Sequence, residues 1–424
     1  MDLAKLLFFL LSFFSTYVSS QLSTSFNTSV IPITKDPKAS LYKITWSGSR
    51  RQPYYLIDLD APFTWKDCTV HRPKKEVDCG VKDCQLPLPC YFSFCKEARS
   101  YVNPICPSLN TTAKYGCDFC VVTPANPISK SCKMSQLTTD FASFSGTNGR
   151  NPSTGLFYSL PFYFSCAPSS LRRSLPKDVG GVVSFSWSNL ALPRQVAFGY
   201  VREKFALCLP SSSMGPGVTF IGDGPFYLLP FSNLDVRSFL SYTPMLRRTP
   251  KSLGYYVKIN RIFIQGKQLS LPLLKSSPVK LSTVVTYTTL RSDIYKALVT
   301  SFAEATKKIP RVSPVQPFGL CFKASAIGSV QAGFRVPKID LEMGSGKNWT
   351  ISGDNSMKRI GNGAACLAFV DGGLGVEDAI VIGSFQMENN FLFMDLLKQR
   401  LGFSSSLLAR GTSCSNFNFT EISE

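Results

Sequence analysis

Residues 55–65 are the feature that most constrains the fold of this chain. Apolar residues 55–57 lead into Asp58, and a turn containing Pro62 follows before Trp65. A similar phrase occurs at residues 279–290, where Ser282 stands at the position of the carboxylate. Recurrence of one sequence plan in both halves of a chain indicates a duplication. We therefore expect two related lobes.

Local patterns elsewhere favour an all-β protein. Residues 41–46 and 255–264 alternate between apolar and polar side chains, as strands with one buried face do. Residues 391–395 and 400–404 predict a closing hairpin. Only residues 292–308 have clear helical spacing, and we expect Ser292 to cap this helix. Lys307 and Lys308 are expected in its last turn, where positive charge suits the helix dipole.

The N-terminal segment predicts secretion. Lys5 precedes an apolar run at residues 6–11, and small residues end at Ser20. This pattern is typical of a signal peptide at residues 1–20, with a mature chain that starts near Gln21. The run is too short for a membrane-spanning helix, and no later segment is long and apolar enough. We expect a soluble extracellular protein of the apoplast or cell wall.

Fourteen cysteines in a secreted chain indicate disulfide bonds, and ten of them lie between residues 68 and 166. Residues 68–132 show little periodicity, so they are expected to be an irregular insertion held by bridges and not by a core. Zinc is the alternative for Cys117 and Cys120. With one histidine in the chain and an oxidising compartment, the disulfide is favoured, and no metal or cofactor is predicted.

The formal net charge of +19 bears on the partners. A secreted cation is not expected to meet nucleic acid, and its long-range partners are acidic proteins or acidic cell-wall polysaccharide. The simpler alternative is that the charge only maintains solubility. Four glycosylation sequons, at Asn27, Asn110, Asn348 and Asn418, fit secretion.

The two recurring phrases resemble the active-site segments of pepsin-like aspartic proteases. In that family the first segment reads Asp-Thr-Gly-Ser, whereas Leu59, Asp60 and Ala61 follow Asp58 here. In the second segment Ser282 replaces the second aspartate, and Val284 replaces the glycine. The protease chemistry needs two carboxylates that share one proton. We therefore expect no proteolysis, with Asp58 retained as a buried remnant.

Nearly the whole mature chain resembles a non-proteolytic branch of this fold in plants. The branch comprises the basic 7S globulins, the extracellular dermal glycoproteins, and the xylanase and xyloglucanase inhibitor proteins. The resemblance is carried by Asp58-Leu59 with Trp65 and Cys68, and by segments 162–168, 190–193, 280–283, 318–322 and 414–420.

This resemblance implies an all-β, two-lobed pepsin-like fold with a disulfide-rich insertion in the first lobe. The lobes are expected at residues 21–230 and 231–424. The late cysteine pattern of the relatives implies two bridges, Cys321–Cys366 within the second lobe and Cys208–Cys414 between the first lobe and the C-terminal tail. It also implies that the protein is not an enzyme.

Inhibitors of this branch bind secreted microbial glycoside hydrolases that attack the plant cell wall. They carry a blocking residue in the loop between positions 404 and 414 of this chain, which here offers Arg410. The xylanase-directed inhibitors resemble a histidine version, so Arg410 resembles the xyloglucanase-directed version. A second loop carries an arginine in some relatives, and the corresponding residue here is Gln331, with Arg335 nearby.

Three classes of function remain open from the sequence. One is an inhibitor that inserts Arg410 between the catalytic carboxylates of a hydrolase. The second is a storage or peptide-binding protein of the 7S globulin kind. The third is an active aspartic protease. For Arg410 itself, the alternative to an inhibitory contact is an ordinary solvated surface arginine.

Overall fold

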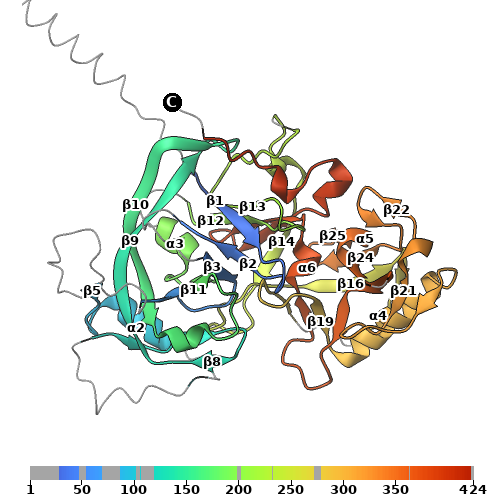
Figure 1. Ribbon diagram of the computed structural model, residues 1–424, viewed down its shortest axis with the longest axis horizontal. Helices are drawn as coiled ribbons and strands as arrows, with labels where there is room; N and C mark the ends of the chain where they lie inside the picture. The colour runs from blue at the N-terminus through green and yellow to red at the C-terminus, as the bar shows by residue number, and fades with distance from the viewer. Residues whose placement is uncertain are drawn as a thin grey trace, which may run out of the picture.

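Two β-rich lobes lie side by side in the structure, the first blue to green and the second yellow to red (Figure 1). This computed structural model describes residues 28–46, 54–68, 86–101, 106, 119–197, 202–231, 233–271, 278–361 and 363–421. The expected signal peptide, residues 1–20, lies outside these ranges. The predicted all-β, two-lobed fold is confirmed.

One antiparallel sheet contains strands from both lobes. Its strands run in the order β1 (Thr28–Lys35), β13 (Gly217–Gly222), β12 (Lys204–Cys208), β30 (Phe391–Asp395), β31 (Arg400–Phe403) and β14 (Ser241–Leu246). Strands β12 and β30 pair over five residues, from Lys204 opposite Asp395 to Cys208 opposite Phe391. The sheet therefore joins the two lobes through main-chain hydrogen bonds.

Each lobe contains the same three-stranded unit, and each unit includes one of the two recurring sequence segments, residues 55–65 and 279–290. In the first lobe β3 (Tyr54–Asp58) pairs in parallel with β11 (Val179–Ser184), which pairs antiparallel with β4 (Trp65–Asp67). In the second lobe β18 (Val279–Leu281) pairs in parallel with β29 (Ile380–Ile382), which pairs antiparallel with β19 (Thr288–Leu290). The duplication read from the sequence is thus present in the strand topology.

The outer part of the first lobe is a long hairpin, β9 (Ser135–Thr147) with β10 (Pro152–Ala167) (Figure 1). The expectation that the insertion lacks a core is wrong for its described part. It contains helix α2 (Ser93–Ser100) and two short strands, β5 (Leu86–Pro87) and β6 (Val121–Val122). Both strands pair antiparallel with β9. A separate apolar cluster, which includes Leu88, Val122 and Leu137, packs beneath them.

The remaining elements of the first lobe are short. Strand β2 (Tyr42–Ile44) pairs with both β1 and β3, and β7 (Ala125–Asn126) pairs with β8 (Ser131–Cys132). Helix α3 (Leu192–Ala197) follows β11, the strand that pairs with β3 and its terminal Asp58. A single 3₁₀ turn covers Ser169–Arg172, and another, Val236–Phe239, lies just beyond the boundary between the lobes.

The second lobe also contains two four-stranded sheets. The strand order of one is β17 (Lys267–Gln268), β16 (Ile259–Ile264), β24 (Ile339–Met343) and β25 (Asn348–Ile351). The strand order of the other is β20 (Arg311–Val312), β21 (Cys321–Lys323), β27 (Ala364–Leu367) and β26 (Met357–Ile360). Strand β15 (Tyr256–Val257) pairs with β14 and β18, and β28 (Phe369–Asp371) pairs with β19. The hairpin β22 (Ser329–Val330) with β23 (Gly333–Phe334) stands apart, and α5 (Gly353–Ser356) and α6 (Ser384–Met387) are single turns.

The predicted helix of the second lobe is α4 (Ser292–Ala305), and two of its expected details are wrong. Its N-cap is Arg291, whereas Ser292 is the first helical residue and donates its hydroxyl to Asp371 at 2.6 Å. The helix ends before Lys307 and Lys308, so these residues do not lie in its last turn. Within the described ranges no helix is long and apolar enough to cross a membrane.

A buried ion pair lies where the lobes meet. The Lys35 ammonium is 2.6 Å from the Glu388 carboxylate, and the Tyr42 hydroxyl donates to the same oxygen at 2.7 Å. Burial raises the pKa of Glu388, while Lys35 and the hydrogen bonds oppose that shift. Removing one partner of such a pair leaves an unpaired buried charge, so each of the two charges requires the other.

Every cysteine in the described part of the chain is in a disulfide bond. The structure contains both bridges that the resemblance implied, Cys208–Cys414 and Cys321–Cys366. Of three further described bridges, Cys68–Cys166 ties the start of the insertion to β10, and Cys95–Cys120 and Cys106–Cys132 lie within the insertion. Because Cys120 is bonded to Cys95, the alternative of a zinc site at Cys117 and Cys120 is wrong.

The Cys208–Cys414 bridge closes a loop of 206 residues. Replacing both cysteines by serine should lower the free energy of unfolding by about 3 to 5 kcal/mol, because the long loop constrains the unfolded chain. Urea unfolding of the variant and the wild type measures this difference. In addition, limited proteolysis should cut the tail beyond residue 404 in this variant and not in a Cys321→Ser/Cys366→Ser control. Equal tail cleavage in both variants would contradict the anchoring role.

Candidate functional site

Asp58 is the last residue of β3 and lies at the junction of the lobes. Its side chain is 6% exposed, and Ser184 of β11 lies opposite it. The Asp58 carboxylate accepts the backbone N–H of Asp60 at 2.9 Å. Burial, with a contribution from the Asp60 charge, raises the pKa of Asp58 to about 6. A single buried carboxyl group with a raised pKa therefore occupies the position of the first aspartate.

Ser282 follows β18 at the equivalent position of the second lobe. Its hydroxyl accepts the backbone N–H of Val285 at 3.2 Å, and its own N–H donates to Ile382 at 3.0 Å. No hydrogen bond joins Asp58 to Ser282 in the part of the chain that the structure describes. A hydroxyl held in a local turn cannot share a carboxylate's proton in the way that a second aspartate does.

Side chains from both phrases connect the lobes beside Asp58. The Thr283 hydroxyl donates to the carbonyl of Ile57 at 2.7 Å, and both groups are buried. Leu59, at the position equivalent to Thr283, is fully buried and apolar, so it cannot form the reciprocal bond. The contact between the two lobes is thus asymmetric. One hydroxyl–carbonyl hydrogen bond forms, where the duplicated fold would allow two.

Asp60 forms a further contact between the lobes. It lies in the bend after β3, and its side chain forms an ion pair with Lys280 of β18. The Lys280 side chain is 21% exposed and that of Asp60 is 41% exposed. Although burial lowers the pKa of Lys280, the charge and hydrogen bond of Asp60 raise it overall. The sequence analysis missed this contact. Its signal is that Asp60 and Lys280 carry opposite charges and lie close in sequence to the equivalent residues Asp58 and Ser282, respectively.

The loop that carries Arg410 is firmly attached to the molecule. Residues Leu407–Arg410 form a 3₁₀ turn that Gly411 ends with a left-handed backbone (φ 76°). The Leu407 N–H donates to the Asn389 carbonyl at 2.7 Å, and the Thr412 hydroxyl donates to the Leu229 carbonyl at 2.6 Å. The Cys208–Cys414 bridge follows directly. Arg410 itself is exposed, with its guanidinium 4.3 Å from the Phe239 ring centre.

Gln331 is at the turn of the hairpin β22–β23 and reaches the Arg410 loop. A Cβ atom placed on Gly411 would lie 3.6 Å from the amide nitrogen of Gln331. Gly333 has φ +87°, and a side chain there would meet the backbone of Asp354, so only glycine lets the hairpin approach α5 this closely. The structure therefore brings together the two loops that the sequence singled out, although 79 residues separate Gln331 from Arg410 in the sequence.

Asp354 in α5 connects the two loops. Its N–H donates to the carbonyl of Ala332 in the hairpin at 3.0 Å, and its carboxylate accepts the hydroxyl of Ser406 next to the 3₁₀ turn. Burial raises the pKa of Asp354, and the Ser406 hydrogen bond opposes this. One short helix thus fixes the hairpin tip and the start of the Arg410 loop relative to each other.

Exposed apolar side chains flank these two loops. Leu229, Phe231 and Leu234 lie near the boundary between the lobes at residue 230, and Val330 comes from the hairpin. The Phe231 ring edge lies 3.8 Å from the Cβ position of Gly411. We call Arg410, Gln331 and these four residues the loop surface. The sequence analysis did not identify the apolar residues, because their clustering depends on the fold.

The glycosylation sequons fall in different settings. Asn27 and Asn110 lie outside the described residues. Asn348 is exposed at the start of β25, and Asn418 is half-buried with its side-chain oxygen accepting the N–H of Thr420 at 3.1 Å. In the described ranges there is no cluster of histidine, cysteine, aspartate and glutamate side chains that could hold a metal ion.

Comparison with known proteins identifies relatives of the whole fold. The model of the "Xylanase inhibitor N-terminal" family matches residues 42–223, and that of the "Xylanase inhibitor C-terminal" family matches residues 254–405. The chain is 38% identical to "Chitinase CLP" of Oryza sativa subsp. japonica, covering 92% of this chain and 91% of that protein.

Two further relatives bear on the candidate site. The chain is 34% identical to "Probable aspartic proteinase GIP2" of Nicotiana benthamiana over 96% of both proteins. The solved structure titled "Crystal structure of edgp" matches with a TM-score of 0.82 and 32% identity, covering 94% of this chain and all of that one. On these matches, which span both lobes, the chain is an aspartic-protease-like protein that belongs to the xylanase-inhibitor family.

Proposed function

We propose that this protein is a secreted, proteolytically inactive inhibitor of microbial glycoside hydrolases that degrade the plant cell wall. The observation that carries the proposal is the loop surface, in which Arg410 and Gln331 lie on adjoining, well-anchored loops flanked by exposed apolar side chains. The family match to xylanase inhibitors supports hydrolases as the partner class.

Arg410 has the chemistry that such a target requires. Glycoside hydrolases use two carboxyl groups in a cleft that binds sugar. A guanidinium is planar and can meet a carboxylate through two parallel hydrogen bonds. Arg410 forms no ion pair with the described residues, so its charge is available to a partner, and Phe239 supports one face of the group. Insertion of this group would neutralise the carboxylates and block the sugar.

The rigidity of the loop favours tight binding. A side chain that is already ordered loses less conformational entropy when a complex forms. The 3₁₀ turn, the Thr412 hydrogen bond and the nearby disulfide restrict the backbone on both sides of Arg410. The exposed rings and aliphatic groups around it can exclude water from the charged contact, as the surroundings of an interface hot spot do.

Secretion and domain organisation are part of the same proposal. The signal-like segment 1–20 and the disulfide content support export to the apoplast or cell wall. We place the lobes at residues 21–230 and 231–424, and the two matched family segments lie on either side of that boundary. The four sequons are proposed glycosylation sites on this exported chain.

The pure protein should not digest denatured haemoglobin at about pH 3 to 5, because Ser282 cannot replace the second carboxylate. A Ser282→Asp variant should also remain inactive, since Leu59, Asp60 and Val284 still alter the turns of both segments. Release of acid-soluble peptides measures the activity, with pepsin as the positive control. Cleavage that pepstatin abolishes would overturn the assignment.

Replacing Asp58 by asparagine should make the protein less sensitive to rising pH. The folded state keeps the Asp58 proton up to a pKa of about 6, whereas an unfolded aspartate loses it near pH 4. Folded wild type therefore binds more protons between these values and loses stability as the pH rises through them. As the pH rises from 4 to 7, the free energy of unfolding of Asp58→Asn should increase by about 2 to 3 kcal/mol relative to that of wild type.

Urea unfolding at both pH values tests this expectation. Asp293→Asn is the control, because hydrogen bonds from Arg291 lower the pKa of this exposed group. The free energy of unfolding of Asp293→Asn should not increase relative to that of wild type as the pH rises. A flat difference between wild type and Asp58→Asn across this range would show that Asp58 is not held protonated.

Arg410→Ala should weaken hydrolase inhibition by about 2 kcal/mol or more, roughly a 30-fold loss of potency, as for a buried charged anchor. Its free energy of unfolding should change by less than about 0.5 kcal/mol, because the side chain is exposed. Arg410→Lys should restore inhibition only in part, since ammonium lacks the planar fork. Inhibition titrations against a xyloglucanase and a xylanase measure these effects.

The matched control is Arg247→Ala, another exposed arginine that stacks on an aromatic ring, with its guanidinium 4.8 Å from Trp187. Its inhibition should equal that of wild type. Equal potency of Arg410→Ala and wild type would remove Arg410 from the contact. If wild type inhibits neither enzyme, the storage or peptide-binding function replaces the inhibitor proposal.

A further inference from the structure

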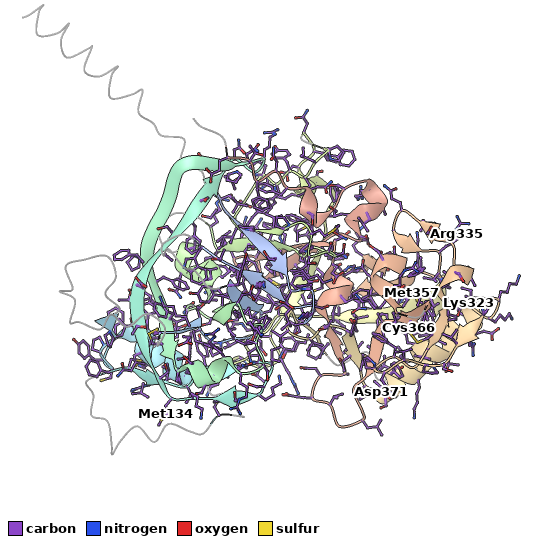
Figure 2. The ribbon with its side chains drawn as sticks, in the orientation of Figure 1. Met134, Lys323, Arg335, Met357, Cys366 and Asp371 are labelled. Carbon is purple, nitrogen blue, oxygen red and sulfur yellow. A yellow bond between two sulfur atoms is a disulfide. The ribbon has the colours of Figure 1, made fainter. Side chains whose placement is uncertain are left out.

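A second possible binding site lies on the outer side of the second lobe. A hollow of about 560 Å³ is bounded by the β16–β17 turn at Gln265 and Gly266, by the end of α4, and by residues 335–340 leading into β24. Figure 2 shows Arg335 at the outer edge of this lobe. The volume is in the range of about 300 to 1,000 Å³ that small ligands occupy.

Two exposed cationic side chains line the hollow. Arg335 and Lys338 are exposed and form no ion pair with the described residues. The stem of Arg335 packs on Gly328, and the backbone N–H of Arg335 donates to the Gly328 carbonyl at 2.7 Å, so the base of this side chain is held in place. Lys267 and Lys308 are exposed and next in sequence to lining residues, which adds positive potential at the rim.

The same hollow contains a hydrogen-bond acceptor and an apolar surface. One oxygen of Asp340 accepts the Thr350 hydroxyl at 2.5 Å, and its second oxygen has no hydrogen bond from the described residues. Ile309, Val336 and Pro337 are half-buried and provide the apolar part. A ligand that fits must therefore combine negative charge, hydroxyl donors and C–H faces.

From this combination we propose that the hollow binds an acidic oligosaccharide whose sugars carry carboxylates. Arg335 pairs with one carboxylate bidentately, and Lys338 pairs with a second as a point charge. Asp340 accepts a sugar hydroxyl, and the apolar residues pack against the ring. A free phosphate fits less well, because at neutral pH it would face the Asp340 charge without enough hydroxyl donors to compensate.

The location allows this site and the loop surface to act at once. Arg335 lies at the open end of the β22–β23 hairpin, where its N–H meets Gly328, whereas Gln331 is at the closed end. Arg410 and the apolar residues of the loop surface do not line the hollow. The protein can therefore be retained on an acidic wall polysaccharide while Arg410 stays free.

Calorimetric titration with trigalacturonic acid tests the proposal, with cellotriose as the neutral probe of equal length. Wild type should bind the acidic probe at least tenfold more tightly than the neutral one. The double variant Arg335→Ala/Lys338→Ala should bind the acidic probe at least tenfold more weakly than wild type. The control Lys323→Ala/Lys347→Ala removes two exposed charges elsewhere on the same lobe, and its affinity for the acidic probe should stay within about twofold of the wild-type value.

Asp340→Asn separates recognition from simple charge attraction. This variant raises the net charge, so a purely electrostatic surface would bind the acidic probe more tightly. The proposed hydroxyl contact predicts severalfold weaker binding instead. The proposal is overturned if wild type does not bind, if the lysine control loses as much as the Arg335/Lys338 variant, if Asp340→Asn binds more tightly, or if inorganic phosphate at equal concentration displaces the sugar.

Discussion

The pairing of β12 with β30 is the constraint on which the other features depend. Five residues of each strand exchange main-chain hydrogen bonds across the lobe boundary, and those groups would be costly to leave unpaired in a buried sheet. The pairing sets the lobes at a fixed distance, which lets Thr283 reach Ile57 and Lys35 reach Glu388. It also places the C-terminal tail beside the first lobe, where Cys414 meets Cys208.

The junction shows how a duplicated fold can persist without its chemistry. Two ionised carboxylates in contact are a cost that only a shared proton relieves. In this chain Ser282 removes one of them, and Asp60 pairs with Lys280 from the other lobe. The residues that once had to present reactive groups can then contribute to holding the lobes together. Burial and the Asp60 charge still raise the pKa of the one carboxyl group that is left, Asp58.

Much of the fold could be predicted because its signals are local. The closing hairpin, predicted at residues 391–395 and 400–404, forms β30 and β31 at nearly those bounds, since two short apolar runs flank a turn. The details that failed depend on tertiary contacts. Ser292 binds Asp371 from a distant strand instead of capping its own helix. The core under the insertion is assembled from scattered apolar residues that have no period in the sequence.

The loop surface shows the same limit and also explains how such a surface can change. Arg410 and Gln331 could be named from the resemblance, but the approach of their two loops requires α5, whose Asp354 bonds both loops, and the close packing at Gly333. These supports lie beneath the loops, whereas the side chains of Arg410 and Gln331 are exposed. Substitution at Arg410 or Gln331 thus leaves the scaffold intact, and target preference can diverge while the anchoring contacts remain. In the proposed inhibitor, recognition therefore lies on loops at the rim and not at the buried junction around Asp58, which holds the lobes together.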